Sequence, residues 1–93
     1  MSQHRFQSQN NQLHVLCGWD RPLQGFFLVI DRDGTFESTP IYSNLYEDTP
    51  HPKTFDGFAV VLARFGIDMP SGLLEALASD KALNTGNSIN MWT

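Results

Sequence analysis

The sequence predicts an α+β fold, a small antiparallel sheet of three to four strands with two C-terminal helices packed on one face. Two observations lead to this class. Apolar residues alternate along much of residues 13–31, and this period of two is typical of strands. From Thr54 onward apolar residues recur every three or four positions, which is typical of helices. A chain of 93 residues is expected to form a single domain, residues 1–93.

The strongest strand signals lie in a central hairpin. Strands are expected at 13–20 and 25–31, and Pro22 lies between them, where its fixed φ and missing N–H interrupt a ladder. The second of these strands is apolar on both faces, which is typical of a strand in the middle of a sheet.

Two registers of this hairpin remain open. Pairing of Trp19 with Phe26 would gather the larger apolar side chains of both strands on the helix side, and we favour it. A slip of one residue would turn Phe27 and Val29 to that side instead, because successive side chains point to opposite faces.

The N-terminal segment carries a weaker strand signal. Residues 1–3 are expected to be disordered, and residues 4–9 to form a short strand. A turn at Asn10-Asn11 would then pair Phe6 with Val15.

After the hairpin, the chain is expected to add an interrupted edge strand at 35–37 and 41–42, since Pro40 suits an edge. At the other end, residues 85–93 form a tail too apolar to be purely solvated. We expect this tail to pack back on the domain, and a short strand is one form that it can take.

Two helices follow from the change of period. Thr54 is the expected N-cap of the first helix and Gly66 its end. Pro70 suits the first turn of the second helix, which fades over residues 81–84. The predicted core comprises Val15, Cys17, Phe26, Leu28, Ile30, Phe55, Phe58, Leu62, Phe65, Leu73, Leu74 and Leu77.

Composition and charge narrow the function classes. The net charge of −4 opposes binding to nucleic acid phosphates or to an anionic membrane. One cysteine permits no intramolecular disulfide, the first twelve residues do not resemble a signal peptide, and no apolar run reaches the length of a membrane span. We therefore expect an acidic cytoplasmic protein without membrane contact.

The side chains suited to transition metals are His4, His14, Cys17 and His51. His14 and Cys17 lie three residues apart on one expected strand, so they point to opposite faces and cannot hold the same ion. A structural zinc site needs four ligands, usually with close paired spacings. The same facing argument separates the thiol from a histidine base, and the sequence predicts no metal, no cofactor and no catalytic residue.

Contact with another protein is the remaining interpretation. The second face of the sheet would carry Leu16, Phe27 and Val29, and two helices can cover only one face. Residues of types enriched in interface hot spots lie at strand ends and in loops. These are Trp19, Arg21, Tyr42 and Tyr46, although Trp19 and Tyr42 would equally well close the ends of the core.

The sequence thus favours a small non-enzymatic interaction module, an adaptor, inhibitor or regulator, that self-associates through the sheet as a homodimer. One alternative is a small-ligand-binding or minor catalytic domain with a site near Trp19, Arg21, Tyr46 and His51. A second is a nucleic-acid-binding accessory protein, which the acidic charge and the missing spaced aromatic residues disfavour.

Overall fold

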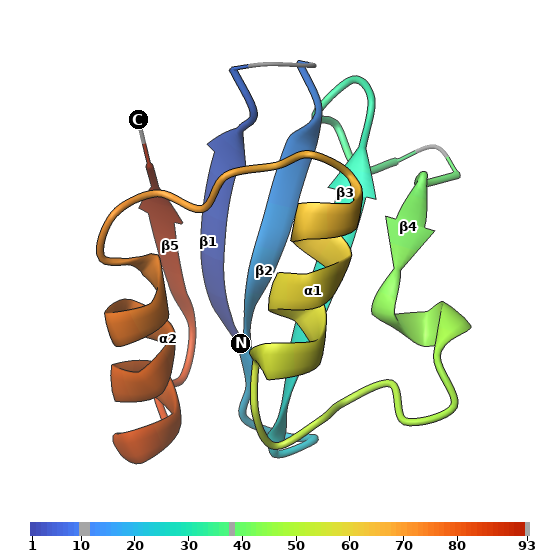
Figure 1. Ribbon diagram of the computed structural model, residues 1–93. Helices are drawn as coiled ribbons and strands as arrows, with labels where there is room; N and C mark the ends of the chain where they lie inside the picture. Colours follow the sequence, from blue (N-terminus) through green and yellow to red (C-terminus); the bar gives the residue numbers. More distant parts are fainter. Residues whose placement is uncertain (10–11, 38, 93) are drawn as a thin grey trace.

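The computed structural model describes residues 1–9, 12–37 and 39–92. The strands are β1 (Ser2–Gln7), β2 (His14–Asp20), β3 (Gly25–Asp31), β4 (Tyr42–Ser43) and β5 (Ser88–Met91). The helices are the short 3-10 helix η1 (Asn44–Tyr46), α1 (Asp56–Arg64) and α2 (Leu73–Ala82). Both α-helices lie over the same face of one sheet, which confirms the α+β class (Figure 1).

The sheet has five strands in the order β4-β3-β2-β1-β5, so the prediction of three to four strands was wrong. It is also mixed, because β1 pairs antiparallel with β2 and parallel with β5. A parallel pair needs a long crossover connection. Here the rest of the domain supplies that connection, so nothing local to the tail could indicate its partner.

The pairing of the central strands confirms the favoured register. Trp19 lies opposite Phe26 across β2 and β3. Phe6 lies opposite Val15 across β1 and β2, as predicted, while the turn predicted at Asn10-Asn11 lies outside the described residues.

Strand β1 begins earlier than expected. Ser2 and Gln3, which we expected to be disordered, belong to the strand. The Ser2 side chain is buried, and its Oγ accepts a hydrogen bond of 2.9 Å from the Trp19 backbone N–H. This bond fastens the start of the chain to the central hairpin.

The strand expected at 35–37 is absent, because the Asp31 carboxylate holds the following residues in a turn. Its oxygens accept hydrogen bonds from the backbone N–H groups of Arg32 and Phe36, each at 2.9 Å. Phe36 has a φ of +58°, which a strand does not permit. The edge strand is therefore limited to β4, one residue beyond the position predicted.

Both α-helices begin later than predicted. Phe55 rather than Thr54 is the N-cap of α1. Gly72, with a φ of +91°, precedes α2 and separates it from Pro70, whose carbonyl accepts a turn hydrogen bond from Leu73. A left-handed residue cannot continue a right-handed helix, so the helix starts at Leu73.

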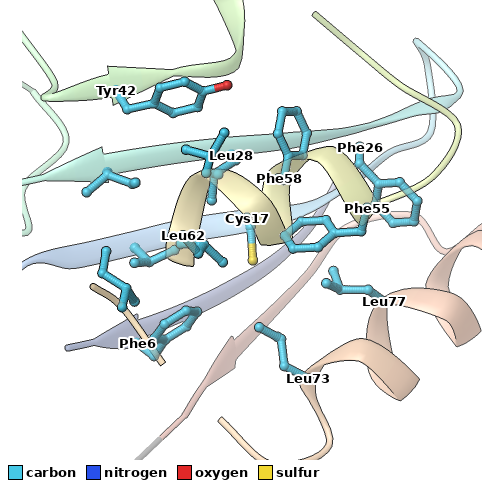
Figure 2. Packing of buried hydrophobic residues seen from close by; sticks show 14 of the residues in the cluster. Phe6, Cys17, Phe26, Leu28, Tyr42, Phe55, Phe58, Leu62, Leu73 and Leu77 are labelled. Atoms are coloured by element: carbon cyan, nitrogen blue, oxygen red, sulfur yellow. The ribbon is translucent and has the colours of Figure 1, made fainter. Parts of the chain in front are cut away.

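The core lies between the sheet and the two helices (Figure 2). Most of the predicted core residues are buried, and Phe65 packs against the cluster while partly exposed. Leu74 was wrongly assigned, since its side chain is 49% exposed. It lies one residue, or about 100°, around the helix from Leu73, whereas Leu77 returns to the core after one turn.

Aromatic contacts connect the hairpin to α1. Trp19 meets Phe26 edge-to-face with ring centroids 5.0 Å apart, Phe26 meets Phe55 at 5.8 Å, and Phe55 meets Phe58 at 5.6 Å. Edge-to-face pairs at this spacing stabilise beyond the area that they bury. The series determines where α1 sits on the sheet. The core also includes Phe6, Tyr42, Val61 and Ile67, which were not in the predicted list.

Replacing Gly18 with Ala should destabilise the fold, because the added Cβ would lie 2.0 Å from the backbone oxygen of Ser2. Strand β1 would have to move, and we expect the free energy of unfolding to fall by about 2–3 kcal/mol. Gly57→Ala is the matched control, since no atom lies within 4 Å of its added Cβ, and it should raise helix stability by up to about 1 kcal/mol. Urea unfolding of both variants checks this; equal midpoints would contradict it.

Candidate interaction surface

The face of the sheet away from α1 and α2 carries no helix (Figure 1). The strand pairings place alternate residues of four strands on this face. We call this surface the open face, and among its side chains are Gln3, Arg5, Leu16, Phe27, Val29, Ile89 and Met91.

The part of the open face over β2 and β3 is largely closed. Phe27 is buried, and Leu16 and Val29 are half-buried. The loop after β3 contributes Phe36, whose ring centroid lies 5.5 Å from the guanidinium carbon of Arg5. A contact of this kind is a cation–π interaction. Of the residues predicted to bind a partner, Leu16 and Val29 thus retain part of their surface and Phe27 very little.

The part of the open face on β5 is exposed. The side chain of Ile89 is 69% exposed and that of Met91 73%. Both follow from the alternation of β5, which turns Ser88 and Asn90 toward the helix side. Two large apolar side chains, separated in sequence by Asn90, thus lie on the same face at one edge of the sheet. The sequence shows this alternation, but only the pairing with β1 shows on which face of the sheet Ile89 and Met91 lie.

Arg5 lies next to this apolar pair, opposite Met91 in the register. Its Nη2 donates a hydrogen bond of 3.1 Å to Gln3 Oε1, and its Nε is buried without a hydrogen-bond partner. Within the described part of the chain Arg5 forms no ion pair with a carboxylate. At the β5 edge the open face therefore combines exposed apolar side chains with the cation of Arg5.

Trp19 and Tyr42 lie in the core on the helix side rather than on the surface. The Trp19 Nε1–H donates to Asn84 Oδ1 at 3.0 Å, and the Tyr42 hydroxyl donates to a Glu47 carboxylate oxygen at 2.6 Å. Both polar groups are therefore satisfied within the chain. The structure assigns these two residues the core-closing role that the sequence left open.

Trp19 is buried, whereas Arg21, Tyr46 and His51 differ in their exposure and surroundings. Arg21 is exposed in the turn between β2 and β3, and Tyr46 is exposed on η1. His51 is half-buried, its backbone lies against Gly25, and its Nδ1 is buried without a partner.

None of these four residues lines either of two pockets found in the described parts of the chain. A cavity of about 210 Å³ lies where the end of β1 meets the segment after α1, with Phe6 and Met69 among its lining residues. Another, of about 310 Å³, lies between α1 and residues 47–52. Neither therefore corresponds to the ligand site predicted around Trp19.

A buried histidine ties three distant segments together. His4 Nε2 lies 2.6 Å from Asp80 Oδ2, and Trp92 Nε1 donates to His4 Nδ1 at 3.0 Å. This geometry implies a neutral His4 that carries its proton on Nε2, because Nδ1 accepts. The contacts join β1 to α2 and to the residue that follows β5. Sequence reasoning missed this cluster, since His4 is more than 70 residues away from each of its two partners.

Cys17 lies opposite His4, so a thiol, an imidazole and a carboxylate occur together. The thiol is fully buried. Burial, with a smaller effect from the negative charge of Asp80, raises its pKa to about 12. A thiol that stays protonated is a poor nucleophile, and both Cys17 and His4 are buried. Among the described residues no group of three or more His, Cys, Asp or Glu side chains is arranged to hold a metal ion.

Comparison with known proteins offers no further guide to the use of this surface. No protein-family model matches the chain, and neither a curated protein nor a solved structure matches it. In the parts of the chain that the structure describes, no helix has the length and apolar character required to cross a membrane.

Replacing His4 with Phe should cost about 2–4 kcal/mol of unfolding free energy, because Asp80 and Trp92 would each lose a partner in a mostly buried place. The double variant His4→Phe, Asp80→Leu also removes the stranded carboxylate and should recover part of the loss. Thermal and urea unfolding measure both. Equal unfolding free energies of the single and double variants would show that an Asp80 carboxylate without His4 costs the fold nothing.

The buried thiol predicts a loss of stability in alkali. Its pKa is about 12 in the folded chain against 9.0 ordinarily, so its contribution is complete below pH 9 and is lost as the pH rises toward 12. The slope should approach about 1.4 kcal/mol per pH unit for this one group. Urea unfolding from pH 8 to pH 11 measures the slope, and Cys17→Ala should reduce it.

Tyr42 provides the control for that experiment. Burial and the hydrogen bond to Glu47 raise its pKa too, so Tyr42→Phe should remove a separate part of the alkaline slope. If Cys17→Ala left the slope unchanged while Tyr42→Phe removed it all, the assignment to the thiol would be wrong.

Proposed function

We propose that this protein is a non-enzymatic interaction module that self-associates through its sheet. One observation carries the proposal, namely the exposure of Ile89 and Met91 on a sheet face that no helix covers. Two large apolar side chains exposed together on an uncovered sheet face favour a site that contacts another protein. Leu16 and Val29 are half-buried farther along the same face, separated from β5 by Gln3 and Arg5 of β1.

The local charge permits a second copy as the partner at this place. The chain carries a net charge of −4, so two copies repel each other at long range. Residues 88–92 contain no charged side chain, and the nearby Arg5 is a cation. Close contact between two β5 strands would therefore bring no like-charged pair of β5 side chains together.

Self-association through β5 would leave other exposed residues free to contact a further protein, and a dimer would carry two copies of each. Among these are Arg21 in the β2–β3 turn and Tyr46 on η1, both of types enriched in interface hot spots. An adaptor, inhibitor or regulator in the cytoplasm fits this arrangement, and the single buried thiol is compatible with that compartment.

The other two functions receive less support. Ligand binding was predicted around Trp19, Arg21, Tyr46 and His51, which line neither described pocket. Nucleic-acid binding by stacking needs exposed aromatic rings on the sheet. Phe27, the aromatic residue of β3 on the open face, is buried.

Replacing Met91 with Glu tests the proposal. Equilibrium sedimentation at micromolar concentration should show a dimer for the unmodified chain. The variant should weaken the dimer by about tenfold or more, because a carboxylate would be buried against apolar surface. A strict monomer for the unmodified chain would refute self-association.

Val60→Glu is the matched control. Val60 is 57% exposed on α1, on the other side of the sheet, and the change adds the same charge. We expect it to leave the sedimentation of the dimer unchanged. Equal weakening by both variants would assign the effect to net charge rather than to the open face.

A further inference from the structure

We infer that two copies join edge to edge, with β5 pairing antiparallel to β5 of the second copy about a two-fold axis at Asn90. This inference rests on the proposed self-association and specifies its partner strand and register. It makes one continuous sheet from two, with the two open faces on the same side.

The backbone of β5 offers unpaired groups to such a partner. The Ser88 N–H donates to the Met1 carbonyl at 3.3 Å and the Trp92 N–H to the Arg5 carbonyl at 2.9 Å. Backbone groups of alternate residues point to opposite edges of a strand, so those of Ile89 and Met91 point away from β1. β5 is the last strand of the sheet, and among the described residues no other strand lies beyond it (Figure 1).

The two edges of the sheet differ in their protection. At the β4 edge the strand has only two residues, Pro40 precedes it closely, and η1 follows at once. Short length and proline are devices that keep an edge from pairing with another chain. The sequence of β5, Ser-Ile-Asn-Met, has neither proline nor charge, and it exposes its two large apolar side chains.

A two-fold axis at Asn90 lets the outward backbone groups of β5 form the most hydrogen bonds. It places Ile89 of each copy opposite Met91 of the other, so the outward N–H and C=O of both residues find partners. Their exposed side chains become neighbours on the open face, which adds apolar burial to a short ladder. An axis at Ile89 would instead pair Met91 with Asn87, which lies outside β5 and binds the N-terminal amine through its side chain.

The edge is also held in position before any partner arrives. The Trp92 indole binds His4, and the Asn90 amide donates to the Gln3 carbonyl at 3.1 Å. A strand already ordered loses less conformational entropy when another strand is added to it. Pairing with the ordered β5 therefore costs less free energy than pairing with a disordered tail of the same length would.

A cysteine at the proposed axis tests the register. Facing residues of this type in an antiparallel pair have Cα atoms about 4.5 Å apart, within the range for a disulfide. Asn90→Cys should form a disulfide-linked dimer under mild oxidation, whereas the unmodified chain, whose only thiol is buried, should not. Ile89→Cys would instead form the disulfide-linked dimer if the axis lay one residue away. Val60→Cys measures how fast disulfides form by random collision.

A proline provides the second test. Ile89→Pro removes an outward N–H that β1 does not use, so the fold should survive by circular dichroism while the dimer weakens by about tenfold or more. Sedimentation separates the two proposals. A dimer in which Asn90→Cys links no faster than Val60→Cys, or in which Ile89→Cys links faster, would overturn this register and leave self-association standing. A monomer would overturn both.

Discussion

Strand β1 is paired on both edges, and the rest of the structure depends on this double pairing. On one edge it continues the central hairpin, and on the other it receives β5 from the far end of the chain. Its one buried histidine also binds α2 and the residue after β5. The N-terminal segment, polar and weakly patterned, thus becomes the place where the two ends of the chain are held together.

One-sided coverage of the sheet is the second constraint. Two helices of nine and ten residues cover one face, where the aromatic residues of β2, β3 and α1 pack. The other face is shielded only near its middle, by the loop that carries Phe36. What remains exposed is concentrated on β5, which explains why the same short strand carries both the proposed function and the proposed register.

Burial also decides the chemistry of the domain. Cys17, His4 and Asp80 include the residue types of a nucleophilic site, yet the thiol is sealed and protonated and both ring nitrogens of the histidine are occupied. Hydrogen bonds that satisfy buried groups make such a cluster a clamp between segments. The cluster therefore holds the segments in their folded positions. The side chains available to a partner lie on the open face and in the exposed loops.

Sequence alone determined the α+β class, the central hairpin and its register, the first helix and most of the core, because hydrophobic period is a property of neighbouring residues. It also indicated a second apolar face, with Leu16 and Val29 on it. Only the tertiary structure decided the pairing of the C-terminal strand with β1, the role of Ser2, the burial of Trp19 and the His4–Asp80 pair. These depend on residues up to 88 positions apart, whose proximity arises from chain folding and leaves no local pattern.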